Sequence, residues 1–224
     1  MTGTDRRGIV RDSLGVGIAT GLYGASFGAI SVASGLSVAQ TCALSLLMFT
    51  GASQFALVGV LGAGGSSVSA AATAMLLGTR NTLYGLRLAP LLGWTRGRRL
   101  GAAHLLIDES SAMSVTRETR EDARLGFLVT GGTVFVLWNL FTLLGAVGGN
   151  AIGDPSTYGL DAAVGGAFLA LLWPQLGKRS HQLVAVLAVA VALGLVPIAP
   201  AGVPVLAAGG VALLAGLLSR EPAS

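Results

Sequence analysis

The chain has 224 residues and a net charge of +4, with 53% apolar residues, 11% charged residues and 34 glycines. Soluble domains carry about 25% charged residues, so this chain has too few charges to cover a soluble globule of its size. The apolar content excludes a disordered chain, and a single cysteine, Cys42, excludes a disulfide-stabilised secreted domain. The arginines stand in short clusters between apolar runs, which is not the pattern of a nucleic-acid-binding surface. An integral membrane protein remains.

Long apolar runs divide the chain into candidate membrane spans, each of which needs about 20 residues as a helix. The last run is too long for one span, and two prolines and a glycine within 196–202 predict a turn that splits it. About seven hydrophobic segments result, in an all-α integral membrane protein with one transmembrane domain over 1–224. A polar connecting region, 93–124, separates two parts and leaves room for an inverted repeat, which is common among transporters. The apolar runs are 13–33, 41–62, 66–92, 125–148, 159–177 and 181–218.

The basic residues orient these segments, because cytoplasmic loops carry an excess of lysine and arginine. Arg6, Arg7 and Arg11 place the N-terminus in the cytoplasm, and the run that follows them is too long for a cleaved signal peptide. The pattern predicts a multi-pass protein of the cell membrane with both chain ends in the cytoplasm. The expected crossings are outward for 13–33, inward for 41–62, outward for 125–148, inward for 159–177, outward for 181–197 and inward for 202–218.

The cluster of Arg96, Arg98 and Arg99 conflicts with this scheme, because a full crossing by 66–92 from the cytoplasm would leave it outside. In one solution 66–92 is re-entrant and returns to the cytoplasm after a break at 78–81. In the other, 66–92 crosses fully and 100–116 crosses back as a short polar span. The positive-inside rule favours the first solution.

Glycines recur at four-residue spacing in the first run, at Gly17 and Gly21 and again at Gly24 and Gly28. This spacing lets two helices approach closely in a membrane. Either the run packs against a neighbouring helix, or it is a bending segment beside a substrate path. The run 202–218 is also rich in small residues and is a candidate contact with a partner subunit.

Polar residues inside the apolar runs each need an explanation, because burying them in lipid has an energetic cost. Thr50, Ser53 and Gln54 lie near the middle of 41–62, with Thr50 and Gln54 expected on one helical face. They are candidates either for interhelical hydrogen bonds or for a polar lining of a substrate site.

A second polar group, with Arg80, Asn81 and Tyr84, lies midway along 66–92. An arginine at that depth must be paired or hydrated, and a helix broken there would offer backbone groups to a polar ligand. The alternative is a structural ion pair between Arg80 and Asp108 or Glu109.

A third group contains His104, Asp108 and Glu109, with His104 and Asp108 expected on one helical face. Partly buried carboxylates suit proton coupling, whereas a cytoplasmic amphipathic helix is the simpler interpretation. A further carboxylate, Asp161, begins the run 159–177, where a helix cap is the default role. These four residues are the candidates for proton coupling or ion pairing.

The chain lacks a nucleotide-binding loop, metal-ligand spacing and the motifs of nucleophilic catalysis. We therefore expect no enzyme activity, no metal and no cofactor. Transport would use an ion gradient or be passive.

Several stretches, taken together and in order, resemble the AzlC family of branched-chain amino acid exporters. The match covers about 13–177. The stretches are GIATGLYG at 17–24, FTGASQF at 49–55, Arg80 followed by LYG at 83–85, IDES at 107–110, and GLDAA at 159–163 followed by FLALLWPQL at 168–176.

This resemblance implies export of leucine, isoleucine, valine or methionine, together with a small, separately encoded membrane partner of the AzlD type. The hypothesis is a secondary exporter, coupled to protons, that works by alternating access at a midplane site. Its expected substrate-binding residues are Thr50, Ser53, Gln54, Arg80, Asn81 and Tyr84. Two rival hypotheses are a passive channel for a small solute and a non-transporting scaffold subunit of a membrane complex.

Overall fold

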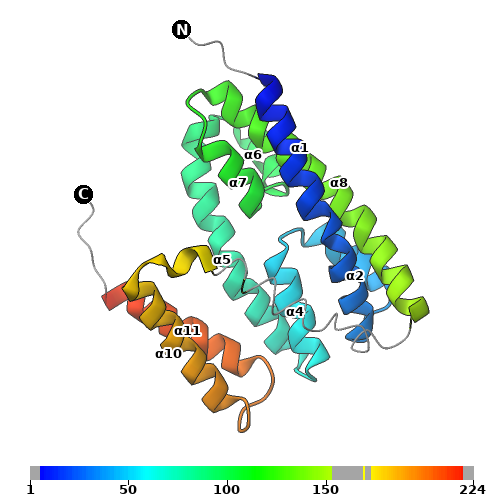
Figure 1. Cartoon of the computed structure of the whole chain (residues 1–224), viewed down its shortest axis with the longest axis vertical. Helices are drawn as coiled ribbons and strands as arrows, with labels where there is room; N and C mark the ends of the chain where they lie inside the picture. Colours follow the sequence, from blue (N-terminus) through cyan, green and yellow to red (C-terminus); the bar gives the residue numbers. More distant parts are fainter. Residues whose placement is uncertain (1–5, 153–168, 170–172, 219–224) are drawn as a thin grey trace.

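The computed structural model describes residues 6–152, 169 and 173–218, and every regular element within these ranges is helical (Figure 1). The predicted all-helical architecture is therefore confirmed. Two stretches, Arg6–Ala33 and Arg120–Gly149, are long and apolar enough to cross a membrane by themselves. Most of the run 159–177 lies outside the described residues. The elements are α1 Arg6–Leu22, α2 Gly24–Ala33, α3 Val38–Leu47, α4 Ala52–Gly62, α5 Ser67–Leu92, α6 Arg96–Ala103, α7 Asp108–Val115, α8 Arg120–Ile152, the 3-10 helix η2 Trp173–Gly177, α10 Arg179–Leu195 and α11 Val203–Leu218.

The first apolar run forms α1 and α2, which pack along α8 with backbones in close contact (Figure 1). This confirms the interpretation of the glycine spacing as a helix-packing face within the chain. Residue numbers rise together along the contact, so the two helical rods run parallel. A Cβ added at Gly17, Gly21, Gly24 or Gly28 would meet Thr133, Leu137, Trp138 or Thr142, respectively.

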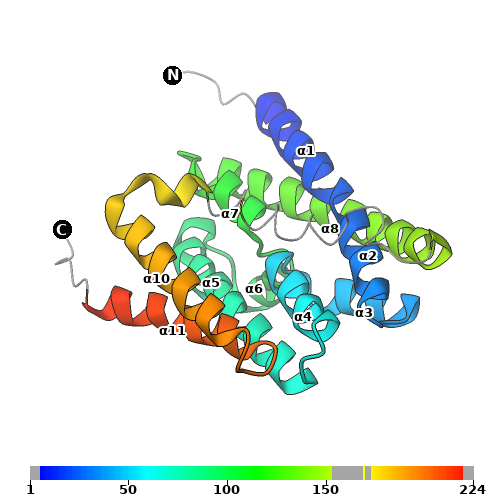
Figure 2. The ribbon, with the colours of Figure 1, turned by 60° about the horizontal axis from the view of Figure 1, so that its bottom comes forward.

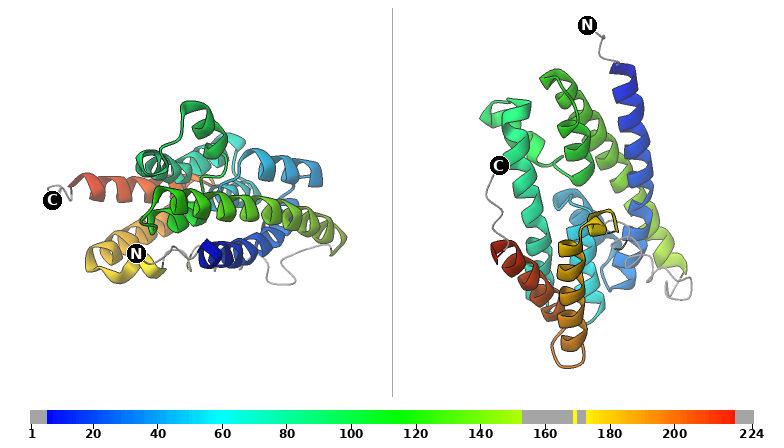
Figure 3. Two further views of the ribbon diagram at one scale, coloured as in Figure 1. Left: turned by 90° about the horizontal axis from the view of Figure 1, so that it is seen from above. Right: turned by 60° about the vertical axis from the view of Figure 1, so that its left-hand side comes forward.

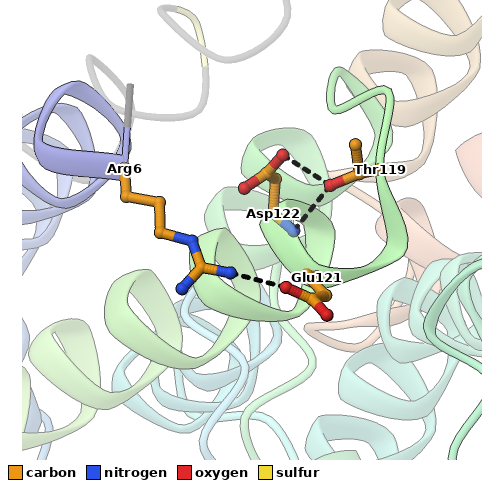
Figure 4. A network of polar contacts seen from close by, with 4 residues as sticks. All are labelled: Arg6, Thr119, Glu121 and Asp122. Atoms are coloured by element: carbon orange, nitrogen blue, oxygen red, sulfur yellow. Dashed lines mark hydrogen bonds and ion pairs between the residues drawn. The ribbon is translucent and has the colours of Figure 1, made fainter. Parts of the chain in front are cut away.

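Both rods begin at the same end of the structure, where Arg6 of α1 pairs with Glu121 of α8 (Figure 4). This ion pair is exposed and adds at most about 1 kcal/mol. The first turn of α8 is fixed by Thr119, whose hydroxyl accepts a hydrogen bond from the Asp122 backbone N–H at 3.2 Å. We call this the basic end, since the arginines near the starts of α1 and α8 gather there, and the opposite end the far end.

The second apolar run does not cross the structure, contrary to the prediction. Helix α3 begins at the far end after α2, the chain breaks at 48–51, and α4 returns to the far end, where Gly62 lies against Ser34. The break occurs because Gly51 adopts a φ of +64°, which side-chain-bearing residues rarely adopt. Segment 38–62 is therefore a helical hairpin whose tip lies inside the molecule.

Helix α5 is continuous over 26 residues, so the predicted break at 78–81 is wrong. It starts at the far end and finishes at the basic end, where Arg124 donates hydrogen bonds to the carbonyls of Leu92, at 2.7 Å, and Gly93, at 3.2 Å. The cluster Arg96–Arg99 thus lies at the basic end although α5 runs the whole way. Because the α3–α4 hairpin begins and ends at the far end, α5 starts at the far end rather than at the basic end. A full crossing by α5 then ends on the same side as the N-terminus, so the conflict described from the sequence does not arise.

A second hairpin enters from the basic end. Helix α6 leads inward, the chain breaks at 104–107, and α7 leads back, so that Leu105 lies against Gly131 and Met113 against Gly126 of α8. The alternative prediction of a short span over 100–116 is therefore also wrong. Figure 1 and the side view in Figure 3 show α6 and α7 at the end opposite the returning end of α4.

The two hairpins share one arrangement in opposite directions. Each is a short helix, a four-residue break and a second short helix, followed by a long helix, α5 or α8. Each second helix restarts in the same way. The Gly51 N–H donates to the Gln54 side-chain oxygen at 3.1 Å, and the Ile107 N–H donates to Ser110 Oγ at 3.1 Å.

Helices α10 and α11 form a peripheral hairpin beside α5 (Figure 2). The turn predicted within 196–202 is confirmed, and it lies at the far end, where Ser69 Oγ donates to the Ala201 carbonyl at 3.0 Å. Within α11, Gly209 lies against Leu76 of α5, whereas the space around Gly210 and Gly216 is open. Most other residues of this hairpin are exposed.

The first hairpin can be tested by cysteine labelling in the cell membrane. Single cysteines are introduced in a Cys42→Ser background as Ala39→Cys, Ala63→Cys or Arg98→Cys. Ala39 and Ala63 are exposed near the start and the end of the hairpin, and Arg98 is exposed at the basic end. We expect a membrane-impermeant maleimide to label positions 39 and 63 from one side and position 98 from the other. Labelling of 39 and 63 from opposite sides would show that 38–62 crosses the membrane.

The glycine contact predicts a strong effect of one methyl group. An alanine Cβ at Gly28 would meet the Thr142 carbonyl oxygen, so Gly28→Ala should destabilise the protein by about 1–3 kcal/mol. Gly15→Ala on α1 is the matched control, because its Cβ meets nothing. Thermal unfolding in detergent measures both, and equal melting temperatures would contradict the contact.

Candidate functional site

A cavity of about 400 Å³ lies where the tips of the two hairpins meet the α1–α2 rod and α8. Small-molecule sites typically have volumes of about 300–1,000 Å³. Residues from four separate stretches of the chain build its wall. They are Ala19, Thr20, Tyr23, Phe49, Thr50, Gly51, Ala52, Phe55, Ile107, Asp108, Glu109, Val134 and Trp138.

One side of the cavity is aromatic. Phe55 packs between Tyr23, with ring centroids 5.3 Å apart, and Trp138, at 6.1 Å, and Phe27 stacks behind on Trp138 at 6.0 Å. Phe27 and Trp138 are almost fully buried. These side chains form a rigid apolar wall suited to an aliphatic group.

The other side is polar and is organised by Arg80. Its Nη1 lies 2.9 Å from Asp108 Oδ2 in the second hairpin, and its Nη2 donates to the Thr50 carbonyl in the first at 3.3 Å. Tyr84, one turn along α5, also interacts with the Asp108 carboxylate. Arg80 does not itself line the cavity. The ion pair to Asp108 is the structural alternative raised by the sequence, and the side chains are 29% and 28% exposed.

Glu109 lines the cavity beside this ion pair. The Thr20 hydroxyl of α1 and the residue's own backbone N–H interact with its carboxylate. Asp108 and Glu109 occupy the first turn of α7, where the helix dipole favours negative charge.

The first polar group divides into different roles. Thr50 lies in the break before α4, so the prediction that it shares a helical face with Gln54 is wrong. Gln54 is buried and holds the hairpin together, since its amide also donates to the Leu44 carbonyl of α3 at 3.3 Å. Ser53 is buried next to Gly78 of α5, and Asn81 is partly buried; neither lines the cavity.

His104 lies at the tip of the second hairpin, and its ring centroid is 6.2 Å from that of Phe49 and 5.3 Å from that of Phe135. It is exposed and does not line the cavity. The break at 104–107 separates it from Asp108, so the two do not share a helical face, as had been expected. Asp161 lies outside the described residues. Within the described parts of the chain, no group of three His, Cys, Asp or Glu side chains has the arrangement of a metal site.

Sequence reasoning missed Thr20, Tyr23, Phe55 and Trp138 as cavity residues. Thr20, Tyr23 and Phe55 lie within motifs that had been noticed, but an aromatic residue in an apolar run gives no sign of which cavity it faces. Their convergence depends on the parallel contact of the α1–α2 rod with α8.

The AzlC family model, described as AzlC protein, matches residues 15–152. The chain belongs to the AzlC family. The match begins in α1, ends with α8 and includes every residue that lines the cavity. AzlC proteins are components of branched-chain amino acid transporters, are generally not enzymes, and pair with AzlD in exporters. No curated protein and no solved structure matches the chain.

The Arg80–Asp108 ion pair can be tested with a double-mutant cycle. Arg80→Gln or Asp108→Asn alone leaves one partly buried charge without its partner and should cost about 1–3 kcal/mol. The double variant removes both charges and should recover part of this loss. Thermal unfolding of the three variants measures the coupling, and strictly additive losses would mean that the ion pair contributes no stability.

Proposed function

We propose that this AzlC protein is the large subunit of a secondary transporter that exports branched-chain or similar hydrophobic amino acids, such as leucine, isoleucine, valine and methionine. The observation that carries the proposal is the two-sided cavity. Its aromatic wall suits an aliphatic side chain, and its polar side, with Thr50 and Glu109, suits the charged head group of an amino acid. Family membership supports the same class of substrate.

The proposed membrane orientation places the basic end in the cytoplasm, in agreement with the positive-inside rule. Helices α5 and α8 and the α1–α2 rod then cross the membrane. The hairpins α3–α4 and α6–α7 enter from opposite sides and meet near the middle. Backbone that is not helical is tolerated at this depth where it is buried in protein or lines a cavity.

In the proposed cycle the hairpin tips control access to the cavity from the two sides. Arg80 touches both tips, through Thr50 and Asp108, so a shift of either hairpin changes its contacts. Two oppositely directed units around one central site are the usual basis of alternating access. The driving ion in this proposal is the proton, because carboxylates line the cavity.

A small AzlD-like subunit is the proposed partner. Exposed apolar residues along α10 and α11 and the open space around Gly210 and Gly216 offer a surface to lipid and to such a subunit.

The passive-channel alternative predicts flux that does not depend on the proton gradient. The scaffold alternative predicts that leucine does not stabilise the protein. A leucine titration followed by thermal unfolding therefore separates the scaffold from the transporter, and an uncoupler separates the channel from it.

Leucine efflux tests the site itself, in cells loaded with a leucine-containing dipeptide and expressing the chain with its small partner. Val134 lines the cavity and is 1% exposed, whereas Val136, on the same helix, is 62% exposed. Val134→Phe should reduce efflux strongly, about tenfold, because it fills the cavity. Val136→Phe should leave efflux unchanged.

Membrane levels of both variants are measured in parallel. Ala19→Leu fills the cavity from the opposite rod. It replaces Val134→Phe as the test variant if Val134→Phe does not reach the membrane. Normal leucine efflux by an inserted, cavity-filled variant would show that the substrate passes elsewhere.

A further inference from the structure

We infer that the Glu109 carboxylate is the place where a proton and the ammonium group of the transported amino acid alternate, so that one proton enters for each amino acid exported. The inference rests on the proposed function. It adds the residue that carries the proton, the number of protons exchanged for each amino acid and the orientation of the bound substrate.

The charges around the cavity favour this assignment. Two carboxylates, Asp108 and Glu109, line it, and the guanidinium of Arg80 is bound to Asp108 and to the Thr50 carbonyl. Among the described residues Glu109 forms no ion pair, although it lies next to one. A partly buried carboxylate that has no ion-pair partner of its own is stabilised by a cation or a proton.

On the aromatic side of the same cavity, hydrogen-bond donors need an acceptor. Trp138 is 3% exposed and lines the cavity, and none of the described residues accepts a hydrogen bond from its indole Nε1–H. An indole N–H can only donate, so it requires an acceptor such as a carboxylate oxygen. Helix α4 also begins at the cavity with Ala52, and the first N–H groups of a helix lack acceptors within it. These donors and Glu109 fit the two ends of a zwitterion.

The other elements packed around Glu109 bring few competing charges. Helix α1 presents the Thr20 hydroxyl, and α8 presents Val134 and Trp138, none of which titrates. The titratable or charged neighbours are Asp108, on the same helix, Arg80 and Tyr84 on α5, and Tyr23 between α1 and α2. Arg80 acts on both carboxylates but forms its ion pair with Asp108, which Tyr84 also contacts, so Glu109 is the carboxylate that exchanges its cation.

The exchange is balanced. On the cytoplasmic side the Glu109 carboxylic acid releases its proton to water as the substrate ammonium takes its place. On the outer side the ammonium leaves and Glu109 takes up a proton from water. The zwitterion carries no net charge, so each cycle moves one positive charge inward.

Leucine binding with proton release tests this directly, using the full chain purified with its co-expressed small subunit. In weakly buffered solution near the pH where Glu109 takes up its proton, the wild type should release up to about one proton per leucine bound. Leucine affinity should fall about tenfold per pH unit on the acid side of that titration, because the proton competes with the ammonium.

Glu109→Gln should abolish the proton release and make the weakened binding independent of pH. Glu109→Asp keeps a carboxylate and should restore release, and the remaining leucine binding of the glutamine variant shows that this variant is folded. Glu118→Gln is the matched control, since Glu118 is exposed in the loop before α8 and should leave binding and release unchanged.

Two fragments of leucine test the orientation. 3-Methylbutylamine keeps the ammonium, so it should displace leucine and release a proton in the wild type. 4-Methylpentanoate keeps only the carboxylate and should release none.

The outcomes separate this inference from the proposed function. If the wild type neither binds nor exports leucine, isoleucine, valine or methionine, the proposed function fails. If it does so and Glu109→Gln still releases a proton on binding, or if only 4-methylpentanoate displaces leucine, the assignment of Glu109 is wrong while the exporter stands.

Discussion

The contact of Arg80 with both hairpin tips is the interaction on which the centre of the molecule depends. A cation at this depth in an apolar environment is costly unless it is paired. The broken hairpins supply what it needs, a free carbonyl from Thr50 and a carboxylate from Asp108. In return, Arg80 provides a donor to backbone that would otherwise lack one at the break. The arginine and the two breaks therefore stabilise each other.

The frame around this centre is built differently. The α1–α2 rod and α8 lie in close parallel contact, since glycines replace side chains along their interface. Packing of this kind is specific, because one added methyl group meets backbone. The rods carry Tyr23, Val134 and Trp138, and Phe55 of the first hairpin packs on this frame to complete the apolar wall. Thr50, Asp108 and Glu109 of the hairpins contribute the polar side.

The two hairpins restart their helices with the same hydrogen bond, from the backbone N–H before the helix to a side chain three residues later. The residues differ, Gln54 in one and Ser110 in the other, so a comparison of sequence identity does not reveal the correspondence. In the proposed transport cycle this similarity allows each hairpin to open the cavity to its own side of the membrane. The difference lies in charge, because only the second hairpin carries carboxylates into the cavity.

The sequence by itself determined the all-helical class, the apolar runs, the turn between α10 and α11 and the polar residues of interest, because composition and hydropathy depend on local chemistry alone. It also gave Asp108 or Glu109 as alternative ion-pair partners for Arg80, and the structure selects Asp108. The sequence could not determine which run was broken. The sequence does not distinguish Gly51, where a positive φ breaks the helix, from Gly78, where the helix is continuous. Contacts with flanking elements decide whether a helix continues at such a glycine. The reversal of α3–α4, and with it the direction of α5 and the position of Arg96–Arg99, were decided by tertiary packing against α2 and α8. The division of roles between Asp108 and Glu109 depends likewise on which one Arg80 reaches, a distance that only the folded chain sets.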